Sequence, residues 1–350
     1  YLIRVCGYRE VSKEEVPRDN ILSSHHAGMG IAVKGRGSYH QVDCIGDYIY
    51  TPPLSNPIRL LGETKFYGLR SSGSPIKVGI SDIRDAVGLL KDVSEYFSRS
   101  KSDGVVRRFS YQSVFFSATG FSKEAQDFGY AHDINLISAT GGTYLKEIVE
   151  AIRAVKIEDF MINGEITNLG DFRGQLRSKL RESGSLSIEN YNENLKIVFQ
   201  KVKKLDRLFL GTLDNRLTVL LIPQFDNDEW IELAHNSLEG RTLKVALYWD
   251  DQPNRLGDLV FKVHLRENRS QMDKEIFQFI VPREILLKYL RDGYLDTVNA
   301  LNMKQQYFSR MRVPFLFEDT FSILTLELDP DWMREMSKNI GLENNGGLNE

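Results

Sequence analysis

The sequence predicts an α/β domain in the first half of the chain and a second, α+β domain after it. In the first half, short runs of β-forming residues alternate with stretches of helical spacing, which is typical of a sheet covered by helices. The second half contains more β-rich runs separated by turn signals. A length of 350 residues also suits two domains of ordinary size. We therefore expect one domain at 1–158, a second at 159–340 and a flexible tail at 341–350.

Four runs of β-forming residues predict the strands of the first domain. Each run is too short for a core helix, and turn signals separate it from the next. Within the first run, Gly46 and Asp47 could form a hairpin turn, and the prolines of 51–57 disfavour a helix in the connection that follows. The expected strands are 42–50, 58–67, 111–118 and 134–138.

Three helices are expected between and after these strands. The first begins at Ser81, where Ser81 and Asp82 are typical of an N-cap and an acidic first turn. Ser122 likewise caps the second helix, and the third ends near residue 156. Apolar residues recur along the first helix at steps of three and four, which predicts one buried face. This stripe consists of Ile83, Val87, Leu90, Val93 and Phe97.

The second half predicts an α+β domain, and its pattern identifies no particular fold. Helical stretches are expected around 186–209 and 283–301, with Pro282 at the first turn of the latter. Periodicity breaks down between about 156 and 172, which suggests the domain boundary. The β-rich runs are RLTVLLIP, TLKVALYW, DLVFKVHL and FSILTLELD.

Composition excludes several classes of protein. The proportions of hydrophobic residues (41%) and charged residues (27%) are those of an ordinary globular protein. No apolar run is long enough to span a bilayer, so an integral membrane protein is excluded. Cys6 and Cys44 lack the spacing of a metal clip, and the N-terminal residues lack a signal-peptide pattern. We therefore expect a cytoplasmic protein with reduced cysteines.

The net charge of −3 averages over an uneven distribution. Five basic residues oppose one acidic residue between Ser98 and Lys123, and nine oppose four between Arg173 and Arg207. From Glu318 to the end, eight acidic residues oppose two basic ones. Most charge runs are simply solvated surface, but basic blocks beside a phosphate-handling site would favour contact with nucleic acid.

The residues that carry chemistry are Asp43 and, twenty positions later, Glu63-Thr64-Lys65. Glu63 and Lys65 share a face if this segment is a strand, and Asp43 joins them if its segment pairs with that strand. Two carboxylates, with the backbone carbonyl of Thr64, form a hard-oxygen site suited to Mg²⁺ or Mn²⁺. An ammonium group beside such a site can orient water and counter the charge of a phosphoryl transition state.

A chance occurrence is the competing interpretation, in which Glu63 and Lys65 are an ordinary solvated pair on a strand edge. Context favours a functional site, because these charges directly follow the apolar residues of an expected core strand. Burying charges without partners is expensive.

In order and spacing, Asp43, Glu63-x-Lys65 and the helix at 81–97 resemble the core of PD-(D/E)xK nucleases. The segment SVFFSATGFSKEAQDFGYAHDINLIS at 113–138 is similar to Mrr-like restriction endonucleases, where a strand leads into a Gly-Phe-Ser/Thr-Lys-Glu-Ala helix. GRGSYHQVD also resembles that family's glycine-rich approach to its first catalytic Asp. Val42 departs from the Pro of the family pattern. The resemblance covers about residues 30–155.

This resemblance implies a restriction-endonuclease-like mixed sheet flanked by helices. It implies metal ligation by Asp43 and Glu63, with Mg²⁺ or Mn²⁺ as cofactor, and a catalytic role for Lys65. Gln41 would support the site from the same strand face as Asp43. An acidic residue on a preceding helix would correspond to Glu14 or Glu15. DNA would be the partner, and the basic residues expected to contact it are Lys34, Arg36, Arg107 and Arg108.

We therefore expect a metal-dependent endonuclease that cuts DNA in restriction or defence, with the second domain serving target choice or assembly. Assembly as a homodimer or with partner defence proteins would fit this function. One alternative is a catalytically idle nuclease-fold protein that binds DNA or acts as a scaffold, which the intact Asp43, Glu63 and Lys65 disfavour. Another is an enzyme acting on a small phosphate ester, which the extended basic blocks disfavour.

Overall fold

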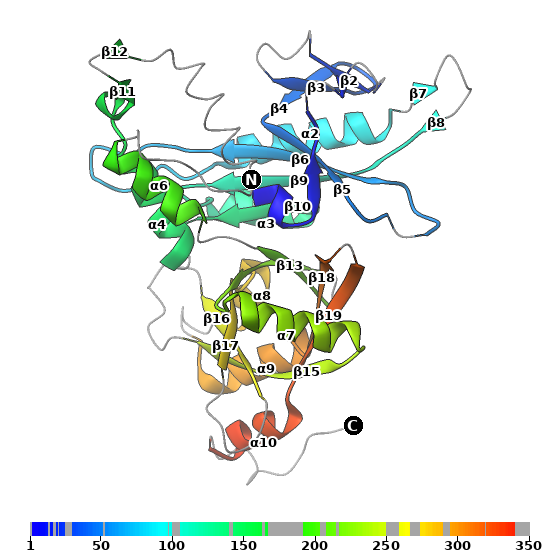
Figure 1. The fold of residues 1–350 in the computed structure, drawn as a ribbon, viewed down its shortest axis with the longest axis vertical. Helices are drawn as coiled ribbons and strands as arrows, with labels where there is room; N and C mark the ends of the chain where they lie inside the picture. The colour runs from blue at the N-terminus through cyan, green and yellow to red at the C-terminus, as the bar shows by residue number, and fades with distance from the viewer. Residues whose placement is uncertain are drawn as a thin grey trace.

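The protein has a mixed α/β structure built around a five-stranded sheet and a closed barrel of seven strands (Figure 1). The structure is a computed structural model. The structure describes residues 2–339 except for 13–14, 17–18, 20, 25–29, 52, 97, 100–105, 140–142, 163–164, 167–191, 204–207, 215–216, 250–258, 267–273, 290–294 and 319.

The five-stranded sheet has the order β1-β5-β6-β9-β10. Its first three strands pair antiparallel, whereas β6, β9 and β10 are parallel to one another. Helices connect the parallel strands, as the geometry of a parallel crossover requires. The strands are β1 (Tyr8–Glu10), β5 (Cys44–Tyr48), β6 (Ile58–Lys65), β9 (Ser110–Ser117) and β10 (Ile134–Ser138).

Helices α2 (Ile80–Ser94) and α3 (Lys123–Ala131) pack on one face of this sheet. Their apolar side chains form a shared core with Phe115 of β9 and Ile134 of β10. The short helix α1 (Leu2–Val5) packs with Leu60 and Val114 on the opposite face. The stripe predicted for α2 is buried or half-buried as far as Val93, and Phe97 lies outside the described residues.

Two local expectations for this region are wrong. There is no turn at Gly46-Asp47, because Gly46 and Asp47 both lie inside β5. The run 42–50 is instead interrupted at Asp43, where the chain bends before β5 begins. Gly46 is needed in β5 for close packing, since a Cβ would lie 2.9 Å from the Cβ of Tyr8. The N-cap of α2 is Gly79 rather than Ser81, and the side chain of Asp82 accepts a hydrogen bond from the Gly79 N–H. Ser122 does cap α3, accepting a hydrogen bond from the Ala125 N–H.

Smaller elements extend from the sheet (Figure 1). Three strands, β2 (Leu22–Ser23), β3 (Ile31–Lys34) and β4 (Tyr39–Val42), form a separate antiparallel sheet. Helices α4 (Thr143–Ala154) and α6 (Glu193–Lys203) pack against each other. The remaining short elements are β7 (Ser98–Arg99), β8 (Val106–Arg107), the 3₁₀ helix η2 (Ile157–Phe160), β11 (Met161–Ile162) and β12 (Glu165–Ile166).

The barrel has the strand order β13-β14-β17-β16-β15-β19-β18 and closes between its end strands. Every pairing is antiparallel except that of β15 with β19. Its strands are β13 (Phe209–Leu213), β14 (Thr218–Pro223), β15 (Thr242–Trp249), β16 (Val260–Leu265), β17 (Lys274–Ile280), β18 (Arg310–Phe317) and β19 (Thr320–Leu328). The helices of this part are α7 (Asn227–Leu238), α8 (Arg283–Tyr289), α9 (Thr297–Tyr307) and α10 (Pro330–Asn339).

The four β-rich runs predicted for the second half are barrel strands, and β13, β17 and β18 were not predicted. Of the helix expected at 186–209, the described part is α6, and strand β13 begins at Phe209. The stretch expected at 283–301 contains two helices, α8 and α9, rather than one. Strand β13 has the sequence FLGTL. The periodicity of so short an apolar run does not distinguish a strand from a helix, and β13 is a strand because it pairs with β14 and β18.

An apolar cluster and a stacked pair of rings connect the first part of the chain with the barrel. Leu210 of β13 packs under the sheet with Leu60, Val114 and Phe116. The rings of Tyr50 and Phe321 stack with centroids 3.9 Å apart. These contacts join the two parts, and the domain boundary near residue 158 stays a prediction. Among the described residues, no helix is both long and apolar enough to cross a membrane.

Arg59 is a buried cation at the beginning of β6, with a side chain only 2% exposed. Its guanidinium donates to both carboxylate oxygens of Asp47, at 2.7 and 3.0 Å, and to Asp19 at 2.8 Å. The guanidinium also lies 3.8 Å from the centroid of the Phe109 ring. Two carboxylates and an aromatic face thus compensate the charge, and the cluster ties the segment around Asp19 to the sheet.

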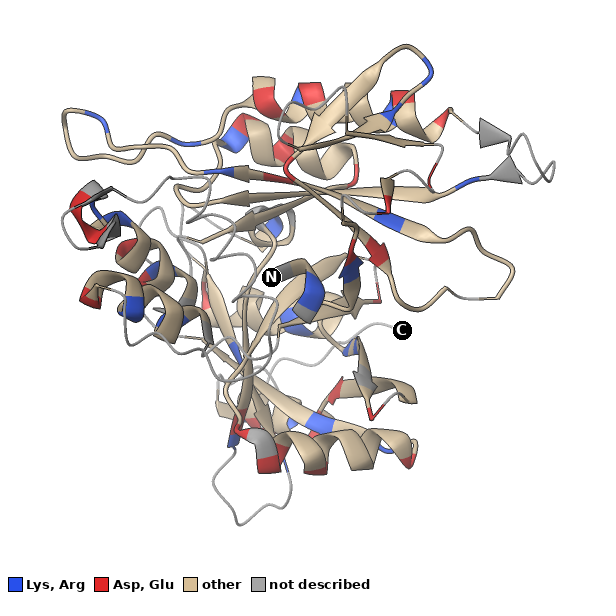
Figure 2. Cartoon of the chain, turned by 45° about the horizontal axis from the view of Figure 1, so that its top comes forward, with Lys and Arg blue, Asp and Glu red and all other residues tan. Residues whose placement is uncertain are grey.

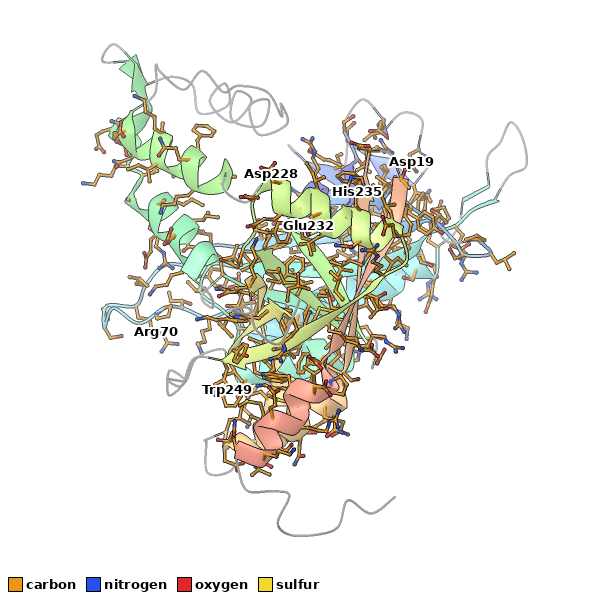
Figure 3. All side chains as sticks on the ribbon, turned by 60° about the horizontal axis from the view of Figure 1, so that its bottom comes forward. Asp19, Arg70, Asp228, Glu232, His235 and Trp249 are labelled. Carbon is orange, nitrogen blue, oxygen red and sulfur yellow. The ribbon has the colours of Figure 1, made fainter. Side chains whose placement is uncertain are left out.

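Lys304 of α9 is a second buried cation, inside the barrel and fully shielded from solvent. Its Nζ donates to the carbonyl oxygen of Leu247 and lies 3.9 Å from the ring centroid of Trp249, which Figure 3 labels. The rings of Trp332 and Phe261 are at 4.9 and 5.4 Å. Among the described residues no carboxylate pairs with Lys304, and burial lowers its pKa to about 7.

Replacing this lysine should remove a pH dependence of stability. The pKa of Lys304 is about 7 in the folded state and about 10.4 in the unfolded chain, so the unfolded state holds more protons between these values. The free energy of unfolding should therefore rise as the pH rises through this window. We expect Lys304→Met to abolish the rise and to stabilise the protein at neutral pH by about 1–4 kcal/mol.

Urea unfolding across this pH window would measure the effect. The control is Lys338→Met, which removes an exposed lysine of α10 and should leave the pH dependence as in the wild type. A Lys304→Met protein whose stability follows the same pH curve as the wild type would contradict the expectation.

Candidate active site

The pairing of β5 with β6 brings Asp43 next to Glu63. Cys44 is opposite Gly62 in this antiparallel ladder, so the next rung places Asp43 opposite Glu63 at the end of the paired region. Thr64 fixes the carboxylate of Asp43, because its backbone N–H and its hydroxyl both donate to Asp43 Oδ2, at 2.7 and 2.9 Å. Two carboxyl groups that are twenty positions apart in the chain therefore meet at one edge of the sheet.

A glycine allows this close pairing. A Cβ at Gly62 would lie 2.3 Å from Cys44 Sγ, so a larger residue would displace the Cys44 side chain, which directly follows Asp43.

Lys65 follows Glu63 on the same face of β6. Its Nζ lies 3.7 Å from Glu63 Oε2 and 4.0 Å from Asp82 Oδ1, which belongs to the first turn of α2. The side chains of all three are between 21% and 27% exposed, so water reaches the group but does not surround it. The Tyr67 hydroxyl donates to the same Asp82 oxygen at 3.0 Å. The ammonium is therefore held between two carboxylates rather than extended into solvent.

Asp82 and Tyr67 were not predicted as site residues. The sequence marks Asp82 only as an acidic residue in the first turn of a helix, and that description is also correct, because Asp82 Oδ2 accepts from the Gly79 N–H at 3.3 Å. Nothing in the spacing of the chain shows that this turn faces Lys65. The approach depends on where α2 packs across the sheet.

Burial and a neighbouring carboxylate set the electrostatics of Glu63. Burial raises the pKa of Glu63 to about 7, and the negative charge of the neighbouring Asp43 adds to this effect. The charge of Lys65 opposes the shift without cancelling it. A second positive charge at this edge would favour the ionised form of Glu63.

The donor atoms at this edge fit a hard divalent cation. The N–H of Thr64 points toward Asp43, and the carbonyl of the same residue lies on the same side of an extended strand. Two carboxylates and a backbone carbonyl are the oxygen ligands that Mg²⁺ and Mn²⁺ prefer. In the described part of the chain, no group of three or more His, Cys, Asp and Glu side chains is arranged to hold a metal ion.

The predicted supporting residues that the structure describes belong to other elements than Glu63 and Lys65. Gln41 is on β4, which belongs to the separate three-stranded sheet, and its side chain is exposed. It therefore does not share a strand face with Asp43. Glu15 is held by Arg9, at 2.5 Å, and by the Ser12 N–H. Glu14 lies outside the described residues.

The residues predicted to contact DNA are distributed over several elements. Lys34 Nζ lies over the rings of Tyr39 and Tyr96, and Arg36 pairs with Glu95 at 2.6 Å. Arg108 is exposed, and the side chain of Arg107 lies outside the described part. The ion pair between Arg36 and Glu95 lies on the surface and contributes at most about 1 kcal/mol to stability. Arg36 could therefore exchange Glu95 for a phosphate.

Comparisons with known proteins give little further information. No family model matches the chain, and no curated protein matches it. One solved structure, described as the crystal structure of a protein of unknown function, AF1548, is similar over 58% of this chain and 91% of its own. The two share 15% sequence identity at a TM-score of 0.30, which is too low to support an inference about fold or function.

The raised pKa of Glu63 predicts a measurable effect on stability in metal-free buffer. A folded-state pKa of about 7, above the ordinary 4.5, means that the folded state keeps this proton when the unfolded chain has lost it. The stabilisation is complete below pH 4.5 and is lost as the pH rises through about 7. Glu63→Gln should remove this dependence, which amounts to at most about 3 kcal/mol.

The measurement is the free energy of unfolding in EDTA at about pH 5 and about pH 8, for wild type and variant. Relative to wild type, Glu63→Gln should be more stable at the higher pH than at the lower. Glu150→Gln on the exposed side of α4 provides the matched control. An unchanged difference between wild type and Glu63→Gln at the two pH values would show that Glu63 is not perturbed.

Proposed function

We propose that the protein is a metal-dependent endonuclease of the PD-(D/E)xK type that hydrolyses phosphodiester bonds of DNA. The observation that carries this proposal is the meeting of Asp43, Glu63 and Lys65 at one edge of the sheet. Asp43 lies at the bend directly before β5, Glu63 and Lys65 lie on β6, and the three occur in the order of that nuclease motif. A chance motif has no reason to assemble in space.

The arrangement of the first part of the chain supports the same proposal. A mixed sheet flanked by helices is what the resemblance to Mrr-like restriction endonucleases implies, and the five-stranded sheet has helices on both faces. Strand β6 carries the Glu-x-Lys residues, and α2 is the next helix along the chain. The restriction-endonuclease-like fold is part of the proposal, because the sheet order alone is shared with other mixed sheets.

Asp43, Glu63 and the carbonyl of Thr64 would hold the metal ion. When bound, Mg²⁺ or Mn²⁺ would polarise a phosphate oxygen and lower the pKa of a coordinated water. The site fits this role, because burial and the neighbouring charge of Asp43 destabilise the ionised form of Glu63 in the absence of a cation.

Lys65 is the group placed to act on the reacting atoms. Its ammonium can donate hydrogen bonds to the attacking water and to a non-bridging phosphate oxygen, which counters the charge that builds up in the transition state. Asp82 and Tyr67 hold the ammonium on this face of the sheet, so Lys65 is oriented before substrate binds. Glu63, 3.7 Å from the same ammonium, limits its motion from the other side.

A cleavage assay tests the proposal. Purified protein is incubated with plasmid, linear and modified DNA in Mg²⁺, Mn²⁺ or EDTA, beside Asp43→Ala, Glu63→Gln and Lys65→Ala. We expect metal-dependent cutting by the wild type, with losses of about 100-fold or more in each variant, because each removes a group that acts on the transition state. Asp85→Asn, an exposed carboxylate on the same helix as Asp82, is the control and should cut normally.

Each alternative outcome has a definite meaning. Tight DNA binding without cutting under any condition would favour the idle, DNA-binding or scaffold interpretation. Cutting by Asp43→Ala at the wild-type rate would refute the site assignment. Hydrolysis of small phosphate esters in place of DNA would refute the proposed substrate.

A further inference from the structure

We propose that residues 66–78, here called the site hairpin, contact duplex DNA beside the cleavage site. In this proposal Arg70 and Lys77 bind phosphates, and Leu69 and Ile76 press into a groove. The inference rests on the proposed function, since it names how the substrate is held at that site. Four observations support it.

First, the site hairpin begins directly after Lys65, so it cannot be far from the reacting phosphate. Tyr67 at its base donates to Asp82, the same carboxylate that faces Lys65. Figure 3 labels Arg70 on the segment that projects outward from the sheet. A substrate that reaches Lys65 would thus have this hairpin beside it.

Second, the hairpin is held in shape by its own backbone. The Ile76 N–H donates to the Gly68 carbonyl at 3.1 Å, and the Arg70 N–H donates to the Ser74 carbonyl at 2.8 Å. Gly73 forms the turn with a φ of +77°, which favours glycine. A preformed hairpin loses less conformational entropy on binding than a flexible loop would.

Third, its charge suits a polyanion. Arg70 and Lys77 are the charged residues between Phe66 and Gly79, and the segment contains no acidic residue. Both side chains are exposed, and no acidic side chain of the described residues forms an ion pair with either. Figure 2 shows the projecting loop with blue segments and no red. Cations that are not already paired can bind phosphates without first losing a carboxylate.

Fourth, the hairpin exposes apolar side chains that the fold does not cover. Leu69 is 53% exposed and Ile76 is 40% exposed, on either side of the turn. Single exposed apolar residues are common, but two beside free cations on a projecting hairpin match the way proteins press apolar wedges into DNA. A protein partner would find the same apolar residues, but the absence of acidic side chains favours a polyanion.

The experiment measures binding separately from cutting. A fluorescent DNA duplex of about 20 base pairs is titrated in EDTA, at salt concentrations from about 50 to 200 mM, with Arg70→Ala/Lys77→Ala and Leu69→Ala/Ile76→Ala. Loss of two phosphate contacts should weaken binding about tenfold or more. It should also reduce the slope of log Kd against log salt concentration, here called the salt slope, by about 1.8. The apolar pair should weaken binding without changing the slope. Arg241→Ala/Arg334→Ala removes the same charge from exposed sites in the barrel part and is the control.

The outcomes separate this inference from the proposed function. If the wild type cuts DNA and both hairpin variants bind and cut like wild type, the site hairpin has no such role. If the wild type binds without cutting and the hairpin variants lose binding, the hairpin proposal stands and the catalytic one fails. If the wild type does not bind DNA at all, both fail. Thermal unfolding of each variant shows whether it is folded, and a second variant, Arg70→Glu, should repel DNA more strongly than Arg70→Ala.

Discussion

The alternation of side chains along β6 is the constraint on which the rest of the structure depends. Arg59, Leu61, Glu63 and Lys65 share one face of this strand, which lies in the middle of the sheet between β5 and β9. A shift by one residue would turn all four to the other face. It would separate Arg59 from its two carboxylates and remove Leu61 from the core. Both changes would destabilise the fold, so the contacts of Arg59 and Leu61 fix the register that places Glu63 and Lys65.

The two ends of β6 differ in how the surrounding residues compensate a buried charge. At Arg59 the structure supplies two carboxylates and an aromatic ring, so the charge is compensated within the fold. At Glu63 burial raises the pKa to about 7, and the charge of the neighbouring Asp43 adds to this effect. Like charges that are crowded at an exposed edge are typical of a site that receives a cation or a substrate. In the proposed nuclease, stability comes from the beginning of the strand and chemistry from its end.

The chain order explains why the proposed DNA contacts lie where they do. The site hairpin connects β6 with α2, so its ends are set by Lys65 on one side and by the hydrogen bond from the Gly79 N–H to Asp82 on the other. Both anchors belong to the candidate active site. The barrel contacts the opposite face of the sheet, where Leu210 packs with Leu60.

The sequence identified the strand that carries Glu63-x-Lys65 and the β-forming run that contains β5, directly after Asp43, because apolar periodicity and β-forming runs are local signals. It also placed Glu63 and Lys65 on one face, since alternation needs no tertiary information. It could not place Asp82 against Lys65 or show that Gln41 lies on another sheet, because helix packing and strand pairing connect distant residues. The barrel was likewise beyond it: four of its strands could be recognised singly, but β13, β17 and β18 were missed, and closure depends on pairing between β13 and β18, about a hundred residues apart.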